Sequence, residues 1–246
     1  MNRRIKYLVI LTCLLIGVPL PGYSQLFKAN ESHREDSDFH YMILPGSFRP
    51  LETRTSFSLL FTQLPFDWVE TSVEVPLFQL NNKLGLPGGF TLESSFQSLV
   101  VSNQLRSGLH WNFVLRKFSF SAGIDAAFLF GKMKIAGFNN KTSGWCTYPV
   151  LSAGYKADKI SFTILAEYSY INSLKITSGT SEILDSRNHE SGPTISFFAE
   201  QPLWKNHIMI LGVINNFQKF YFPAWPAFSS FDKRFYIPQF YVGLIL

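Results

Sequence analysis

The chain has 246 residues, of which 16% are charged and 16% are aromatic, including 25 phenylalanines. An average soluble domain is about a quarter charged, so this composition suits an apolar surrounding better than water. The formal charge of +5 falls to +2 when Arg3, Arg4 and Lys6 are set aside as part of a leader, and no basic cluster remains that would favour nucleic-acid binding.

Residues 1–24 have the three parts of a secretory signal peptide: a basic start, an apolar run over residues 7–18, and small residues before Gln25. The apolar run is shorter than the roughly 20 residues of a spanning helix, which disfavours a retained anchor. Cys13 lies in this run and Cys146 is the only other cysteine, so the exported chain would have no disulfide.

Residues 25–52 are charged at first and then carry Pro45 and Pro50. We expect a periplasmic N-terminal tail here, with partial folding into the lumen of a barrel as an alternative. The remaining residues, 53–246, are long enough for one all-β domain.

Strands must make any membrane crossing after the leader, because no later segment is apolar for long enough to form a membrane helix. Residues 104–115 and 118–130 alternate between an apolar face and a small or polar face, and 146–156 and 159–171 repeat the pattern. A soluble sandwich gives the same period. The length of the apolar faces, the small polar opposite faces and the alternation of short and long connections favour lipid.

The predicted fold class is an all-β, antiparallel up-and-down transmembrane β-barrel of ten strands, with eight or twelve as alternatives. Pro76 interrupts the second strand and suggests a bulge there. The predicted strands are 54–63, 69–86, 90–101, 104–115, 118–130, 146–156, 159–171, 191–201, 207–216 and 234–246.

The connections assign the two sides of the membrane, because outer-membrane barrels have short periplasmic turns and longer outer loops. The predicted outer loops are residues 131–145, 172–190 and 217–233. Aromatic residues beside predicted strand ends are expected in the interfacial girdles. These residues are Trp204, Tyr221, Trp225 and Phe228.

Three phrases, Glu200–Lys205, Phe222–Phe228 and Phe240–Leu246, resemble a family of Gram-negative outer-membrane barrel proteins that carries no assigned activity. The resemblance covers the second half of the chain best and implies the cell outer membrane as location. The alternating apolar C-terminus is similar to the signal recognised by barrel-insertion machinery, although its last residue is Leu246 instead of an aromatic one. The expected partners are outer-membrane lipid and that machinery.

Common hydrolase and nucleotide-binding motifs are absent from the sequence. A barrel hydrolase acting on lipid or peptide would need a histidine at the outer rim, and only His189, near Asp185, Ser186 and Glu190, is predicted there. We therefore expect no enzyme, no cofactor and no metal site. The other histidines beyond the leader are His33, His40, His110 and His207.

Inward-facing charges are expected to pair and fill a narrow lumen, since about eight strands enclose only side chains whereas porins use about sixteen. The leading functional hypothesis is a narrow small-solute channel or a scaffold that presents loops. The alternatives are the barrel hydrolase and a secreted soluble lipocalin-like binder. The lumen-facing polar candidates are Arg106, His110, Asp125, Lys156, Glu167 and Glu200.

Overall fold

The computed structural model describes residues 41–46, 48–65, 74–135, 138–179, 181–203, 207–227 and 232–246. The predicted signal peptide, most of the predicted tail and the first part of the predicted second strand lie outside these residues. The same holds for His33, His40, Trp204 and Phe228.

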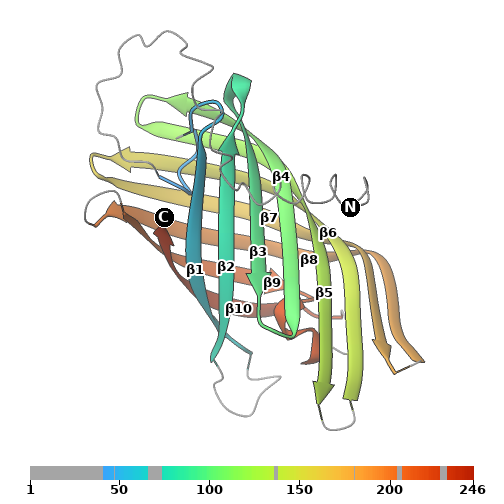
Figure 1. Cartoon of the computed structure of the whole chain (residues 1–246). Helices are drawn as coiled ribbons and strands as arrows, with labels where there is room; N and C mark the ends of the chain where they lie inside the picture. The colour runs from blue at the N-terminus through green and yellow to red at the C-terminus, as the bar shows by residue number, and fades with distance from the viewer. Residues whose placement is uncertain are drawn as a thin grey trace, which may run out of the picture.

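The chain is a closed barrel of ten antiparallel strands, each hydrogen-bonded to its neighbours in the sequence, with the first strand paired to the last (Figure 1). The predicted fold class and strand number are confirmed. The strands are β1 (Thr53–Gln63), β2 (Glu74–Gly85), β3 (Phe90–Ser98), β4 (Ser102–Leu115), β5 (Phe118–Ile135), β6 (Phe138–Ala157), β7 (Ile160–Ser178), β8 (Ser181–Pro202), β9 (Ile208–Gln218) and β10 (Phe235–Ile245). Short 3₁₀ helices, η1 (Pro87–Gly89) and η2 (Phe222–Ala227), interrupt two connections.

Closure depends on the pairing of β1 with β10, which runs from Ser56 opposite Ile245 to Thr62 opposite Gln239. This ladder leaves no sheet edge within the barrel wall. A wall without edges satisfies its backbone hydrogen bonds internally, which a lipid surrounding requires.

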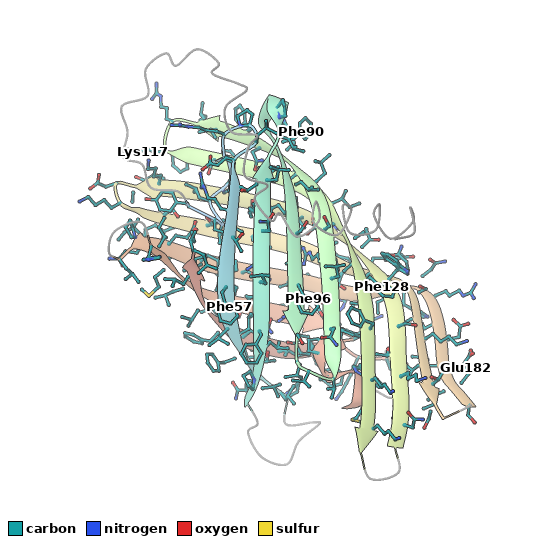
Figure 2. The ribbon with its side chains drawn as sticks, viewed as in Figure 1. Phe57, Phe90, Phe96, Lys117, Phe128 and Glu182 are labelled. Carbon is teal, nitrogen blue, oxygen red and sulfur yellow. The ribbon has the colours of Figure 1, made fainter. Side chains whose placement is uncertain are left out.

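Large apolar side chains are exposed on the outside of the barrel, and Phe57, Phe90 and Phe96 are labelled among them in Figure 2. A soluble monomer rarely exposes a contiguous apolar patch of more than a few hundred Å². On β4 and β5 the exposed set includes Leu105, Leu109, Trp111, Phe113, Phe120 and Ile124. The described chain contains no helix of the length and apolar character needed to cross a membrane.

The strands β5 to β8 continue far beyond their predicted ends, so the predicted long loops 131–145 and 172–190 are wrong. Both segments belong to two long hairpins, β5–β6 and β7–β8, that project past the other strands (Figure 1). The pairing of β4 with β5 stops at Gly131, and the pairing of β8 with β9 stops at Thr194. We call the end of the barrel from which these two hairpins project the hairpin end. The opposite, turn end carries the tight turns at 116–117 and 158–159, and Figure 2 labels Lys117 and Glu182 at the two ends.

The two faces of the wall exchange polarity towards the hairpin end, which explains the incorrect loops. On the inward face of β5, Asp125 is followed by buried Ala127 and Leu129, whereas on the outward face Phe130 is followed by exposed Lys132. Polar residues replace apolar ones on the outer surface here, as expected where a wall leaves the hydrocarbon of a membrane, and the hydrogen-bonded ladder continues. Polarity alone therefore predicted loops where the strands continue.

The predicted bulge at Pro76 is also wrong, because the register between β1 and β2 is continuous from Thr53 to Gln63. Strand β2 pairs with β3 only from Phe78 onwards, so the missing N–H of Pro76 interrupts no ladder on that side. Register shifts occur instead in the long hairpins, at Trp145/Cys146, Ser169/Tyr170 and Ile176/Thr177.

Residues 41–46 enter the lumen at the turn end. The backbone N–H groups of Met42, Ile43 and Leu44 donate to the carboxylate of Glu200 on β8, at 2.6, 3.0 and 2.9 Å. Arg54 on β1 donates to the carbonyl oxygen of Tyr41. Because Tyr41, Met42 and Leu44 are buried in a cluster with apolar residues of β1, β2 and β8–β10, this segment fills part of the lumen.

A long connection joins β9 to β10 at the hairpin end, close to the predicted bounds 217–233, and its described part enters the lumen. The girdle positions predicted for Tyr221 and Trp225 are therefore corrected. Trp225 is 1% exposed and packs with Phe220 and Phe222 against inward residues of β5–β7. Two wall hydroxyls hold this segment: Ser102 donates to the carbonyl of Pro223 at 3.1 Å, and Ser191 to that of Phe220 at 2.9 Å. An aromatic segment is equally compatible with a membrane interface and with the inside of a closed barrel. Its sequence therefore does not show which of the two positions it takes.

Cys146 offers a direct test of the closure at the hairpin end, because its thiol is buried in the same cluster as Trp225. We expect a charged thiol reagent to label Cys146 slowly in the folded barrel. Trp225→Ala should accelerate labelling by about 100-fold, since truncating a buried tryptophan costs about 3–5 kcal/mol and here weakens one local segment. Mass spectrometry assigns the label to Cys146.

The matched control is Trp111→Ala, because Trp111 is 52% exposed on the outside of β4. It should leave the labelling rate unchanged. Equal rates in the native protein and the Trp225→Ala variant would show that η2 does not shield the lumen.

Candidate functional site

Four of the six lumen-facing candidates come together in one buried cluster. Arg106 and His110 lie on β4, Asp125 on β5 and Glu167 on β7, and all four line a cavity inside the barrel. The other two candidates, Glu200 and Lys156, do not line this cavity. Glu200 is fully buried under residues 42–44, and Lys156 is partly exposed beside the turn at 158–159.

Arg106 is the centre of the cluster. Its Nε donates to Oδ2 of Asp125 at 2.6 Å, and its Nη2 donates to Oε2 of Glu167 at 2.7 Å. Strand β7 is not a neighbour of β4 in the sheet, so the second bond crosses the lumen. His110 Nε2 contacts the other oxygen of Asp125 at 2.7 Å. The two carboxylates, one guanidinium and one imidazole thus form a continuous network.

Two glycines on the inward face make room for this network. A Cβ atom at Gly108, between Arg106 and His110 on β4, would lie 1.7 Å from Oδ1 of Asp125. A Cβ at Gly123 on β5 would lie 2.5 Å from the ring of His110. Without a side chain at these positions, the carboxylate and the imidazole can approach the backbone of the neighbouring strand, so glycine is required at both positions.

Tyr148 on β6 completes the surroundings of Arg106. The guanidinium carbon lies 4.3 Å from the centre of the Tyr148 ring, within the range of a cation–π contact. Gln104 donates to the Tyr148 hydroxyl at 3.4 Å. The site residues predicted from the sequence did not include Tyr148, Gly108 or Gly123. Glycines at inward positions of two adjacent strands were the available signal.

A second polar network lies on the wall formed by β8, β9, β10 and β1. The amide of Gln239 donates to Tyr221 Oη at 2.6 Å and to Thr62 at 2.8 Å, and it accepts from Asn216 at 3.0 Å. Tyr221 belongs to the segment that closes the hairpin end. This network therefore attaches that segment to the wall opposite Trp225.

The cavity has a volume of about 220 Å³ and reaches both closing segments, since Met42 and Ile43 line it from one end and Phe222 and Pro223 from the other. Small-molecule pockets typically measure roughly 300–1,000 Å³. This space suits water better than a larger ligand. In the described part of the chain no group of three or more His, Cys, Asp or Glu side chains could hold a metal ion.

The three histidines in the described part of the chain, His110, His189 and His207, lie apart from one another. His110 is buried against Asp125, away from membrane lipid. His207 Nδ1 lies 3.5 Å from the carbonyl of Ile245 beside the turn end. His189 is exposed, but it lies within strand β8 and not in the predicted loop.

These features define the class: the chain is a transmembrane β-barrel with a polar, ion-paired interior. No family model matches the chain, and no curated protein matches it in sequence. Solved structures similar to it include Neisserial surface protein A, at 12% identity and a TM-score of 0.37, covering 79% of this chain and 96% of that one.

Two further similar structures are the toluene transporter TodX of Pseudomonas putida and outer membrane phospholipase A of Escherichia coli. TodX shares 8% identity at a TM-score of 0.38, with 82% of this chain and 90% of that chain covered. The phospholipase shares 11% identity at a TM-score of 0.38, with 86% and 94% covered. At these identities and TM-scores the similar structures do not indicate a function for this chain. The fold is assigned from the strand pairing of the chain itself.

The ion pairs around Arg106 predict how the free energy of unfolding changes when one or all of their charges are removed. Arg106→Met should lower the free energy of unfolding by about 3–5 kcal/mol, because it leaves two buried carboxylates without their cation. The triple variant Arg106→Met, Asp125→Asn, Glu167→Gln removes all three charges and should recover much of that loss. Urea unfolding in detergent, followed by tryptophan fluorescence, measures both.

Lys83→Met is the control, since Lys83 pairs with a single carboxylate, Glu93, at 2.6 Å. Lys83→Met should lower the free energy of unfolding by less than Arg106→Met does. A triple variant that is less stable than Arg106→Met alone would contradict the pairing described for the cluster.

Proposed function

We propose that this protein is a non-enzymatic outer-membrane barrel whose lumen is closed and whose hairpin end presents a rigid sheet at the cell surface. The observation that carries this proposal is the presence of the chain's own segments, 41–46 and 219–227, inside opposite ends of the lumen. The paired charges around Arg106 support the same conclusion, because a conducting path favours unpaired charge of one sign.

The outer-membrane location is supported by the strand number and by the position of both barrel ends. Barrels of an even number of antiparallel strands are the form that spans the bacterial outer membrane. Strand β1 begins and β10 ends at the turn end, next to the short turns. This arrangement supports a periplasmic position for the turn end, because short turns face the periplasm in outer-membrane barrels. The exposed apolar belt argues against a secreted lipocalin-like binder.

The presented surface is the part of β5–β8 that lies beyond the ends of β4 and β9. Residues 181–193 of β8 extend past the last pair with β9, which corresponds to about 40 Å of strand at roughly 3.3 Å per residue. The inward side of this sheet is packed around η2 through Leu174 and Ile176. Such packing makes the projection a rigid surface, as a scaffold for contacts outside the cell requires.

A gated small-solute channel is the second candidate, and one observation favours it. The carboxylate of Glu200 accepts from the backbone N–H groups of residues 42, 43 and 44, so one side chain makes three of the hydrogen bonds that hold the closing segment at the turn end. Hydrolysis is the weaker alternative: loss of a detected lipid or peptide hydrolysis in His189→Ala would support it.

Planar-bilayer conductance tests the closed lumen. We expect the native protein to give no unitary steps at high salt. Glu200→Gln and Trp225→Ala each loosen one closure and should remain silent alone, because the two closures act in series. The combined variant should conduct.

The matched control is Glu93→Gln combined with Trp225→Ala, since Glu93 is a lumen-lining carboxylate that pairs with Lys83 on the barrel wall. This control should stay silent. Regular steps from the native protein would overturn the closed scaffold in favour of the channel.

A further inference from the structure

A cationic surface lies on the outward side of the long hairpins. We call it the lysine face and define it as Lys132 and Lys134 on β5, Lys141 on β6 and Lys175 on β7. All four side chains are exposed. Lys132 and Lys134 share the parity of Phe130, which places them on the outer side of the same strand.

The register brings two of these lysines into direct opposition. Lys132 pairs with Lys141 across β5 and β6. Like charges opposite one another on a sheet face destabilise the pair unless an anion lies between them. The sequence supplies no such anion nearby, because residues 126–157 contain neither aspartate nor glutamate.

Two acidic residues near the tip of the neighbouring hairpin are already paired, one of them with Lys175 of the lysine face. Glu182 forms an ion pair with Lys175, and Asp185 lies 3.5 Å from Arg187. Among the described residues no ion pair involves Lys132, Lys134 or Lys141. Three cations therefore remain uncompensated on one side of a two-stranded segment.

Aromatic residues mark the level of the membrane surface directly beside this face. The ring of Phe128 lies 5.7 Å from that of Phe130 and 4.9 Å from that of Trp145 on β6. Aromatic girdles of this kind sit at the level of lipid headgroups. Lys132 follows Phe130 by two residues, about 7 Å along the strand, so its ammonium lies at the height of the headgroups.

We propose that the lysine face binds the phosphate groups of lipids in the outer leaflet, with one phosphate bridging Lys132 and Lys141. The ligand class is a phosphorylated membrane lipid, of which lipid A, with two phosphates on one headgroup, is the probe of choice. The proposal uses the placement of the hairpin end at the outer surface, but not the closure of the lumen. Experiments can therefore contradict lipid binding and lumen closure independently of each other.

Native mass spectrometry of the detergent-solubilised barrel, titrated with lipid A, tests the binding. Each lysine at a membrane surface contributes about fivefold to the affinity for anionic lipid, so the variant Lys132→Gln, Lys134→Gln, Lys141→Gln should bind about 100-fold more weakly. The control Lys117→Gln, Lys159→Gln removes two exposed lysines at the turn end and should bind like the native protein.

Two measurements on the native protein identify the source of the phosphate. Dephosphorylated lipid A should lose most of the binding, and inorganic phosphate at equal concentration should not compete with lipid A. Undiminished binding of the dephosphorylated lipid, or of lipid A to the triple variant, would overturn the proposal. Full competition by inorganic phosphate would assign the face to a free anion instead of a lipid.

Discussion

The requirement that every backbone N–H and C=O in lipid finds a partner within the chain governs this structure. The pairing of β1 with β10 satisfies it by closing the sheet. Closure creates an interior too wide to be filled by wall side chains everywhere and too narrow for a wide aqueous channel. The chain fills this interior with the segment bound by Glu200, the segment carrying Trp225, and the ion-paired layer around Arg106.

The solvent outside the wall, more than any intrinsic preference for strand, determined what could be predicted. Where the outer face meets lipid, residues such as Phe113 and Phe120 alternate with polar inward residues, and the ten strands and their order followed from that period. Beyond the hydrocarbon, Lys132 and Asn139 are exposed on the outer face and the contrast between the two faces disappears. The sequence therefore predicted loops in place of strands. Tyr221 and Trp225 were placed at the membrane interface because apolarity does not distinguish lipid from a closed lumen.

The interior was predictable by parity but not by partner. Alternation alone placed Arg106, His110, Asp125 and Glu167 on the inward face, and all four line the cavity. The bond from Arg106 to Glu167 joins strands that are not neighbours, so it depends on the curvature of the closed barrel and has no signature in the sequence. The role of Gly108 in making room for Asp125 could not be predicted either. A glycine on an inward face indicates that space is needed there, but it does not indicate which group occupies the space.

The length of β8 has a consequence for neighbouring proteins in a crowded membrane. Ser191 still accepts a hydrogen bond from the backbone N–H of Lys219, but the part of β8 before Glu190 pairs only with β7 among the described residues, so residues 181–189 form a sheet edge outside the barrel. An edge of this kind can pair with the edge of another chain. The charged side chains of Glu182, Asp185 and Arg187 and the register shifts opposite this segment, at Ser169/Tyr170 and Ile176/Thr177, oppose such pairing. The same irregularities that twist the projecting hairpin therefore help to keep individual barrels from joining into continuous sheets.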